Sequence, residues 1–179
     1  MYFKNCKEEN ARNAALAEAF RKAKEEYEKR LAEQKAAAQR AALEAAERAR
    51  LEAQSKNSLR KAVVAYALLF VGRPYVHAGR SLITGTDCSG FTALVYKQFG
   101  YSLSYAPERQ WMQGTQVEMN LSKMLPGDLI FFTSTTKAIG HVGIYLGDGR
   151  LIHAASPELG VIISPAFYRQ PVCVIRIIQ

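Results

Sequence analysis

Cys88 is the residue in this sequence best suited to covalent chemistry. It follows loop residues at 82–86, and an apolar pattern with helical spacing begins at Phe91 and stops at Gly100. We therefore expect the cysteine at or just before a helix N-terminus, where free N–H groups and the helix dipole lower the pKa of a thiol. Most free cysteines are small buried side chains, so a reactive Cys88 needs support from the rest of the chain.

A thiolate nucleophile needs a base, usually a histidine, and a third group that orients the base. His141 opens one predicted strand and His153 lies in the next, and Gly147-Asp148-Gly149 joins them. A three-residue loop puts both imidazoles on one face as diagonal neighbours, whereas a two-residue loop puts them on opposite faces. We expect three loop residues or a bulge, with His141 as base and then acid, and His153 orienting it. A neutral imidazole stabilises an imidazolium less than a carboxylate does, so we expect a modest Cys88–His141 ion pair.

Other interpretations of these residues stay open at this point. The two strand histidines could be packed or solvated without a chemical role. Cys88, His141 and His153 could also hold zinc, because one Cys and two His with an open position form a known ligand set. Their spacing is not compact, so we expect no metal and no other cofactor. His77, in a loop, could compete as the base, although loop histidines are more often solvated or packed.

The surrounding elements predict an α+β fold, with helices first and an antiparallel sheet after them. Residues 8–54 are rich in Ala, Glu, Lys and Arg and predict one long helix. Ser55–Ser58 is the expected boundary, where Asn57 or Ser58 caps a second helix over 59–71. A short helix near 107–113 precedes five strand-like runs at 128–133, 142–146, 151–155, 161–163 and 172–178.

Composition divides the chain into an arm, residues 1–56, and a globular domain, residues 57–179. The arm has 13 Lys and Arg against 10 Asp and Glu, and all 12 glycines and 6 prolines follow it. A partial apolar seam that includes Leu16, Phe20 and Tyr27 fades after Leu31. We expect a spacer or weak coiled coil, which either stays a solvated single helix or associates with a copy or a partner through residues 8–54.

Charge and cysteine content limit the function classes. The net charge of +8 favours anionic partners, but no basic stripe is interleaved with aromatic residues, so we expect no nucleic acid. Three distant cysteines, Cys6, Cys88 and Cys173, argue against a disulfide framework. The longest apolar run, 62–71, is too short to span a membrane. The polar first 13 residues predict no signal peptide, so the chain is either a piece of an exported protein or leaves the cell by another route.

Five motifs follow one another along the globular part of the chain. In sequence order they are Gly72-Arg73-Pro74-Tyr75-Val76, Thr86-Asp87-Cys88-Ser89-Gly90-Phe91, Leu125-Pro126-Gly127-Asp128-Leu129-Ile130-Phe131-Phe132, Gly140-His141-Val142-Gly143-Ile144-Tyr145-Leu146-Gly147 and Leu151-Ile152-His153-Ala154. Their order and spacing resemble those of the NlpC/p60 cell-wall cysteine peptidases. The resemblance covers about residues 58–179 and includes the twelve-residue step between the two histidines.

The resemblance implies a papain-like fold and hydrolysis of peptidoglycan stem peptides, typically between D-isoglutamate and the next diamino acid, outside the cell or in its wall. His77-Ala78-Gly79 departs from the Trp-Gly-Gly common in the family. The alternatives are an amidase or acyl transferase on the same fold, or a non-catalytic adaptor that binds through the arm. The implied site residues are the triad Cys88, His141 and His153, then Tyr75 beside the substrate carbonyl and oxyanion, and Asp87 and Ser89 at the substrate's amine end.

Overall fold

The computed structural model describes residues 2–134 and 138–179, with side chains from residue 8 onward. The chain divides into two compact units, Met1–Glu52 and Ala53–Gln179. The assignment of residues 1–56 as an arm and 57–179 as a catalytic domain stays a prediction. Among the described residues, no helix has both the length and the apolar character that crossing a bilayer requires.

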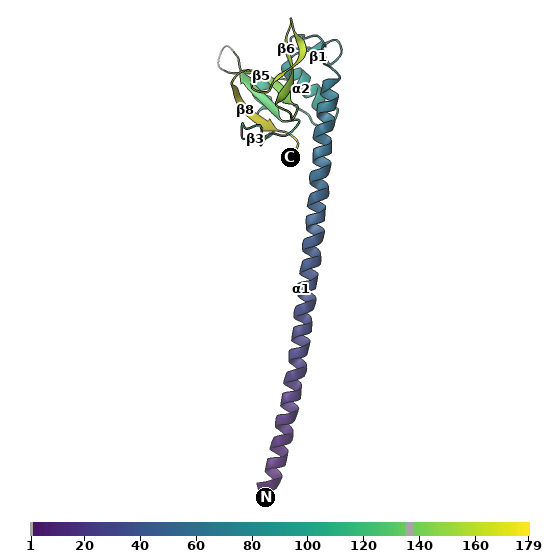
Figure 1. Ribbon diagram of the computed structural model, residues 1–179, viewed down its shortest axis with the longest axis vertical. Helices are drawn as coiled ribbons and strands as arrows, with labels where there is room; N and C mark the ends of the chain where they lie inside the picture. Colours follow the sequence, from purple (N-terminus) through teal and green to yellow (C-terminus); the bar gives the residue numbers. More distant parts are fainter. Residues whose placement is uncertain (1, 135–137) are drawn as a thin grey trace. The chain divides into compact units, whose positions relative to one another are not determined.

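Helix α1 (Tyr2–Leu68) continues through Ser55–Ser58 without a break (Figure 1). The prediction of two helices that meet there is therefore wrong. The Ser58 hydroxyl donates to the carbonyl oxygen of Gln54 at 3.1 Å, one turn back, instead of capping a new helix. No Gly or Pro precedes Gly72, so nothing in this stretch forces the backbone out of the helix.

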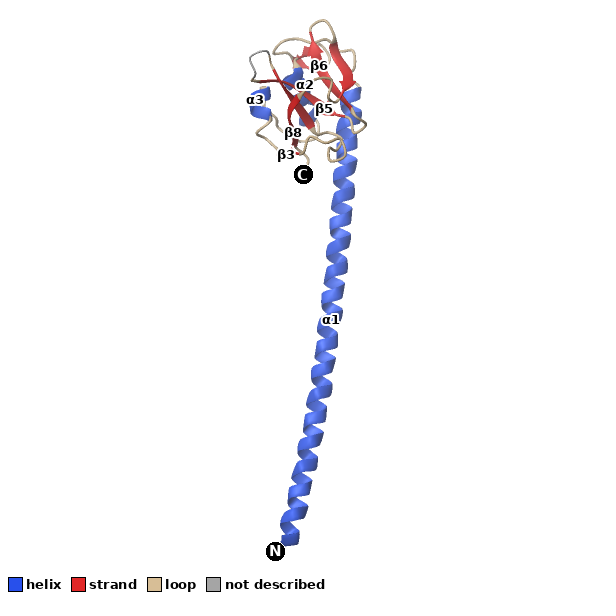
Figure 2. Cartoon of the chain, turned by 60° about the vertical axis from the view of Figure 1, so that its left-hand side comes forward, coloured by secondary structure: helices blue, strands red, loops and turns tan. Residues whose placement is uncertain are grey.

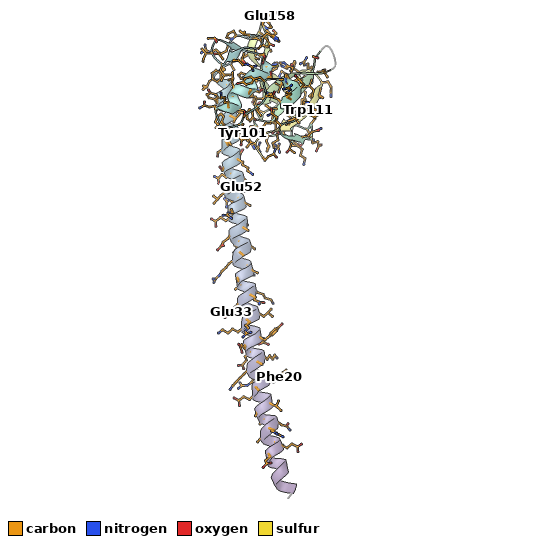
Figure 3. All side chains as sticks on the ribbon, turned by 180° about the vertical axis from the view of Figure 1, so that it is seen from behind. Phe20, Glu33, Glu52, Tyr101, Trp111 and Glu158 are labelled. Atoms are coloured by element: carbon orange, nitrogen blue, oxygen red, sulfur yellow. The ribbon has the colours of Figure 1, made fainter. Side chains whose placement is uncertain are left out.

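In the unit Met1–Glu52, every side chain that the structure describes is exposed. Glu26 and Arg30, one turn apart, form an ion pair at 2.6 Å that adds local helix stability. Phe20 of the predicted seam stands out from the helix (Figure 3). Three seam residues are largely exposed within this chain, at 67% for Leu16, 75% for Phe20 and 66% for Tyr27. Pairing of this helix as a coiled coil stays a prediction.

The unit Ala53–Gln179 combines α2 (Cys88–Lys97) and α3 (Pro107–Gln110) with a six-stranded antiparallel sheet (Figure 2). The predicted α+β class is confirmed. Sequence analysis missed β3 (Thr115–Val117) and a small two-stranded sheet, β1 (Arg80–Ser81) with β2 (Gly85–Thr86). In the order of the large sheet, the strands are β3 (Thr115–Val117), β8 (Pro171–Arg176), β4 (Leu129–Thr133), β5 (Ile139–Tyr145), β6 (Arg150–Ser156) and β7 (Gly160–Pro165).

Both faces of the sheet are buried, and successive side chains along a strand point to opposite faces. In β4, Leu129 and Phe131 belong to the larger core, which also contains Phe91 and Tyr96 of α2. Ile130 and Phe132 belong to a smaller core on the other side. Helix α2 packs against β5 and β6. The start of this helix is thereby brought to the two strands that carry His141 and His153.

A buried carboxylate ties the sheet to the end of α1. Asp128 is completely buried and accepts two hydrogen bonds from Arg176 of β8, at 2.9 and 2.8 Å. It also accepts from the backbone N–H of Leu125 at 2.8 Å, and the Arg60 guanidinium lies 3.9 Å away. Arg60 in turn donates to the carbonyl oxygen of Ile178. The charges of two arginines and one aspartate therefore depend on one another.

We expect Asp128→Ala to lower the free energy of unfolding by about 3 kcal/mol, because it leaves two arginines in or near the core without their carboxylate. Urea denaturation followed by circular dichroism measures the change. Arg150→Ala is the matched control, since it removes an exposed pair with Asp148, and we expect it to leave the midpoint nearly unchanged. Equal midpoints for the two variants would contradict the anchoring role of Asp128.

Candidate active site

Cys88 is the first residue of α2, as the sequence predicts. Asp87 caps this helix, since its Oδ1 accepts from the Gly90 N–H at 2.7 Å while its Oδ2 accepts from the Ala78 N–H at 3.0 Å. A Cβ added to Gly90 would lie 2.4 Å from the Thr86 hydroxyl oxygen, so β2 can pack this closely only against glycine. The cap and the close packing together fix the position of the thiol.

The Cys88 sulfur lies against the backbone of β5. It is 4.0 Å from the carbonyl oxygen of Gly140, and the Val142 backbone also hydrogen bonds to it. These two residues flank His141, so the thiol meets the strand at the position of the predicted base. The side chain is only 5% exposed. The sulfur is therefore held against the stretch of β5 that carries His141, with little contact to solvent.

The two strand histidines are in direct contact, with His141 Nε2 2.7 Å from His153 Nδ1. The register pairs Ile144 with Ile152, and the Leu146 N–H donates to the Arg150 carbonyl, which leaves three loop residues. The prediction of a three-residue loop with both imidazoles on one face is confirmed.

Gly143 permits the close approach of β5 and β6 at this pair. A Cβ added there would lie 2.1 Å from Leu151 Cδ1 and 3.1 Å from the Cβ of His153. Any larger residue would push against the strand that carries His153. A glycine on β5 is thus part of the construction of the site, because it sets how near the second imidazole can come to the first.

Residues that sequence analysis missed surround the histidine pair. His153 Nε2 lies 3.0 Å from the hydroxyl oxygen of Ser164 on β7. The Tyr168 ring lies 5.2 Å from the His153 ring, and the Arg169 guanidinium lies 5.4 Å from the Tyr168 ring. The only signal for Ser164 is a polar residue after an apolar strand pattern. Tyr168 and Arg169 lie in a loop with no motif, so no sequence signal identified them.

Burial keeps the three central groups uncharged at neutral pH. The pKa of Cys88 is raised to about 11, chiefly by burial and also by nearby Asp87, while the Val142 backbone hydrogen bond acts in the opposite direction. Burial, followed by the neighbouring His153 and Arg169, lowers the pKa of His141 to about 3. Burial, followed by Arg169, lowers the pKa of His153 to about 4. The predictions of a lowered thiol pKa and of a resting ion pair are therefore wrong, because lost solvation outweighs the helix N-terminus.

Tyr75 and Ser89 also lie near the thiol, but in different environments. Burial raises the pKa of the half-buried Tyr75, and the proximity of Cys88 and Asp87 raises it further. Ser89 is 2% exposed, and its hydroxyl lies 2.7 Å from the Tyr105 carbonyl oxygen and 3.1 Å from Asp87 Oδ1. The single hydroxyl proton of Ser89 is thus donated to an acceptor within the protein. Contact of Ser89 with substrate stays a prediction.

The loop before α2 holds the alternative base and the departure from the family motif. His77 is exposed, whereas His141 and His153 are buried. Ala78 adopts φ 55°, a left-handed conformation that favours glycine, and the Asp87 carboxylate holds its N–H. An alanine at this position therefore adds a methyl group to the loop at some conformational cost.

Cys6 and Cys173 are the other two cysteines of the sequence. Cys173 is a free, buried cysteine on β8. Cys6 lies outside the described side chains. Among the residues that the structure describes, no group of three or more His, Cys, Asp or Glu side chains is placed to hold a metal ion.

Comparison with known proteins gives the family of this chain. A family model described as the NlpC/P60 family matches residues 72–173, which include the thiol and both buried histidines. The chain belongs to the NlpC/P60 family. A solved structure of an NlpC/P60 family protein from Bacillus cereus ATCC 10987 is similar, with a TM-score of 0.61 and 32% identity over 65% of this chain and 39% of that one. The papain-like α+β fold expected from the sequence is thereby confirmed.

Two curated relatives in the NlpC/P60 comparison carry names that refer to glutamyl bonds. The chain is 41% identical over 98 residues to the gamma-DL-glutamyl hydrolase of Bacillus subtilis (strain 168), covering 54% of this chain and 23% of that protein. It is 38% identical over 99 residues to the gamma-D-glutamyl-L-lysine dipeptidyl-peptidase of Bacillus cereus (strain ATCC 10987 / NRS 248), covering 54% and 29%. The match thus spans less than a third of either relative.

We expect iodoacetamide to alkylate Cys88 at pH 7 roughly 100-fold more slowly than free cysteine, because only the thiolate reacts and the raised pKa leaves little of it. The rate should rise about tenfold per pH unit from 7 to 9 without levelling off. Mass spectrometry of the peptide that contains Cys88 measures the rate, and Cys88→Ser assigns the signal. A plateau near pH 7 would contradict the neutral resting thiol.

Proposed function

We propose that this chain is a peptidoglycan endopeptidase that hydrolyses the stem-peptide amide bond between D-isoglutamate and the following diamino acid. The observation that carries the proposal is a thiol at a helix start, held against the strand that bears one of two hydrogen-bonded histidines. The names of the two curated relatives support a glutamyl bond as the target. The wall polymer places this activity outside the cell or in the cell wall.

In this proposal His141 acts as the base for Cys88. Its Nε2 is engaged with His153, which leaves Nδ1 to take the thiol proton. Because the pKa directions leave both groups neutral, the proton moves while the sulfur attacks the carbonyl carbon rather than before. His153 stabilises the imidazolium that forms on His141 by accepting its Nε2–H.

The oxyanion that forms during attack needs donors close to the sulfur. The Cys88 N–H belongs to the first turn of α2, where backbone N–H groups have no partner within the helix. The Tyr75 hydroxyl is the second donor, and its raised pKa keeps it protonated. Two donors aimed at the developing charge stabilise the tetrahedral intermediate more than the substrate.

The remaining steps return the enzyme to its resting state. The imidazolium of His141 gives its proton to the leaving amine, the C–N bond breaks, and the acyl group stays on Sγ as a thioester. His141 then takes a proton from water, whose oxygen attacks the thioester carbon. The C–S bond breaks, the carboxylic acid leaves, and the imidazolium of His141 returns its proton to sulfur to give the thiol. Asp87, which is half-exposed, accepts hydrogen bonds from the substrate's amine end in this scheme.

Residues 57–179 form the catalytic domain in this proposal, and residues 1–56 form an arm that positions it or pairs with another helix. The exposed seam of Leu16, Phe20 and Tyr27 supports pairing, since these side chains are more than half exposed within the chain.

We expect incubation with muropeptides to yield fragments that end in isoglutamate and fragments that begin with the diamino acid. In H₂¹⁸O, mass spectrometry should find one ¹⁸O in the new isoglutamate carboxyl, because water resolves the thioester. Diaminopimelate and lysine substrates run side by side identify the accepted diamino acid, and Cys88→Ala is the inactive control. A product joined to another amine would favour an acyl transferase, and an unchanged muropeptide profile would refute hydrolysis and favour an adaptor.

We expect His141→Ala to lower kcat by roughly a thousandfold or more, because the thiol then has no base. His77→Ala should keep most of the activity, since that histidine is exposed in the loop. Both values come from the same muropeptide assay, with circular dichroism as the check on folding. The reverse ranking would overturn the assignment of the base.

A further inference from the structure

Both ring nitrogens of His153 have a partner inside the protein. Nδ1 lies 2.7 Å from His141 Nε2, and Nε2 lies 3.0 Å from the Ser164 hydroxyl oxygen. His153 is 2% exposed, so bulk water does not readily replace either partner. Ser164 comes from β7, the strand next to β6, where it pairs with Leu151. The two contacts make a continuous path of hydrogen bonds from β5 across β6 to β7.

Two neutral imidazoles in contact can share their hydrogen bond in two ways. If His153 donates from Nδ1, the proton of His141 sits on Nδ1, and His141 cannot accept a proton from a thiol there. If His141 donates from Nε2, its Nδ1 is free to accept. His153 must then carry its own proton on Nε2, facing Ser164. Only the second arrangement gives His141 the role of a base.

The second arrangement leaves a buried N–H on His153 that needs an acceptor. The Ser164 hydroxyl oxygen is within hydrogen-bond distance of that nitrogen. An unpaired buried donor carries a substantial penalty, so removing the acceptor disfavours the productive tautomer. The need for an acceptor at the Nε2–H of His153 grows during the reaction, because an imidazolium at His141 can only donate to His153.

We propose that Ser164 is a positioning residue, an inference that rests on the proposed function. Ser164 accepts the Nε2–H of His153 and thereby holds both histidines in the tautomers that catalysis requires. It touches neither the thiol nor the substrate and acts through two imidazoles. The groups that face His153 are the His141 ring, the Tyr168 ring at 5.2 Å and the nearby positive charge of Arg169. That charge opposes protonation of His153, so His153 relays a hydrogen bond and stays neutral.

The test compares Ser164→Thr with Ser164→Val in the full chain, because these side chains have nearly the same shape and differ in the hydroxyl. Long-range ¹H–¹⁵N spectra of protein labelled at histidine report the tautomer of each ring at pH 7, and Ser122→Ala, at an exposed position, is the control. We expect wild type, Ser164→Thr and Ser122→Ala to show the Nε2–H form of both His141 and His153. Ser164→Val should show a mixture of tautomers.

In the muropeptide assay, we expect kcat of Ser164→Val to fall roughly 10- to 100-fold with KM within about twofold, and Ser164→Thr to keep most of the rate. Identical histidine spectra for Ser164→Val and wild type would overturn the proposal, as would equal kcat values for the Val and Thr variants. Inactivity of the wild-type chain would refute the proposed function instead, and the spectra would still decide the role of Ser164.

Discussion

The hydrogen bond between the imidazoles of His141 and His153 is the interaction on which the rest of the site depends. Its 2.7 Å distance requires a register that makes the two residues diagonal neighbours, and a glycine at position 143 that lets the strands approach. The hydrogen bond also requires that at most one of the two rings be a charged imidazolium, since two imidazolium ions at this distance repel one another. Burial of both rings meets that requirement, and α2 then brings the thiol to the same strand.

A neutral resting state follows from how deeply these groups are buried. A thiolate and an imidazolium would both lose hydration in a site where Cys88 is almost inaccessible, and one helix N-terminus does not compensate for that loss. Separating charge between sulfur and imidazole therefore costs least during the reaction, when an atom of the substrate can receive the negative charge. In the proposed reaction, bond formation to sulfur and proton transfer to His141 are therefore coupled, and Tyr75, whose raised pKa keeps it protonated, is the proposed second donor to the developing charge.

Local patterns predicted the parts of the site that lie close together in sequence. The face shared by His141 and His153 follows from one hairpin loop, and the position of Cys88 follows from one helix start. The pKa of Cys88 was not predictable, because burial depends on the packing of distant elements. Ser164 was missed for a similar reason: the register of β7 against β6 is fixed by tertiary structure. The continuous α1 was missed because polar residues such as Ser58 can also bond back within a helix.

The contact between Arg60 and the Ile178 carbonyl has a consequence for how this fold is used in longer proteins. It joins a residue near the beginning of the unit Ala53–Gln179 to a residue near its end. A domain whose two ends lie together can be inserted between other modules, or joined to them on either side, with little distortion of its interior. The NlpC/P60 relatives compared above are several times longer than the matched region, and this architecture suits such modular assembly.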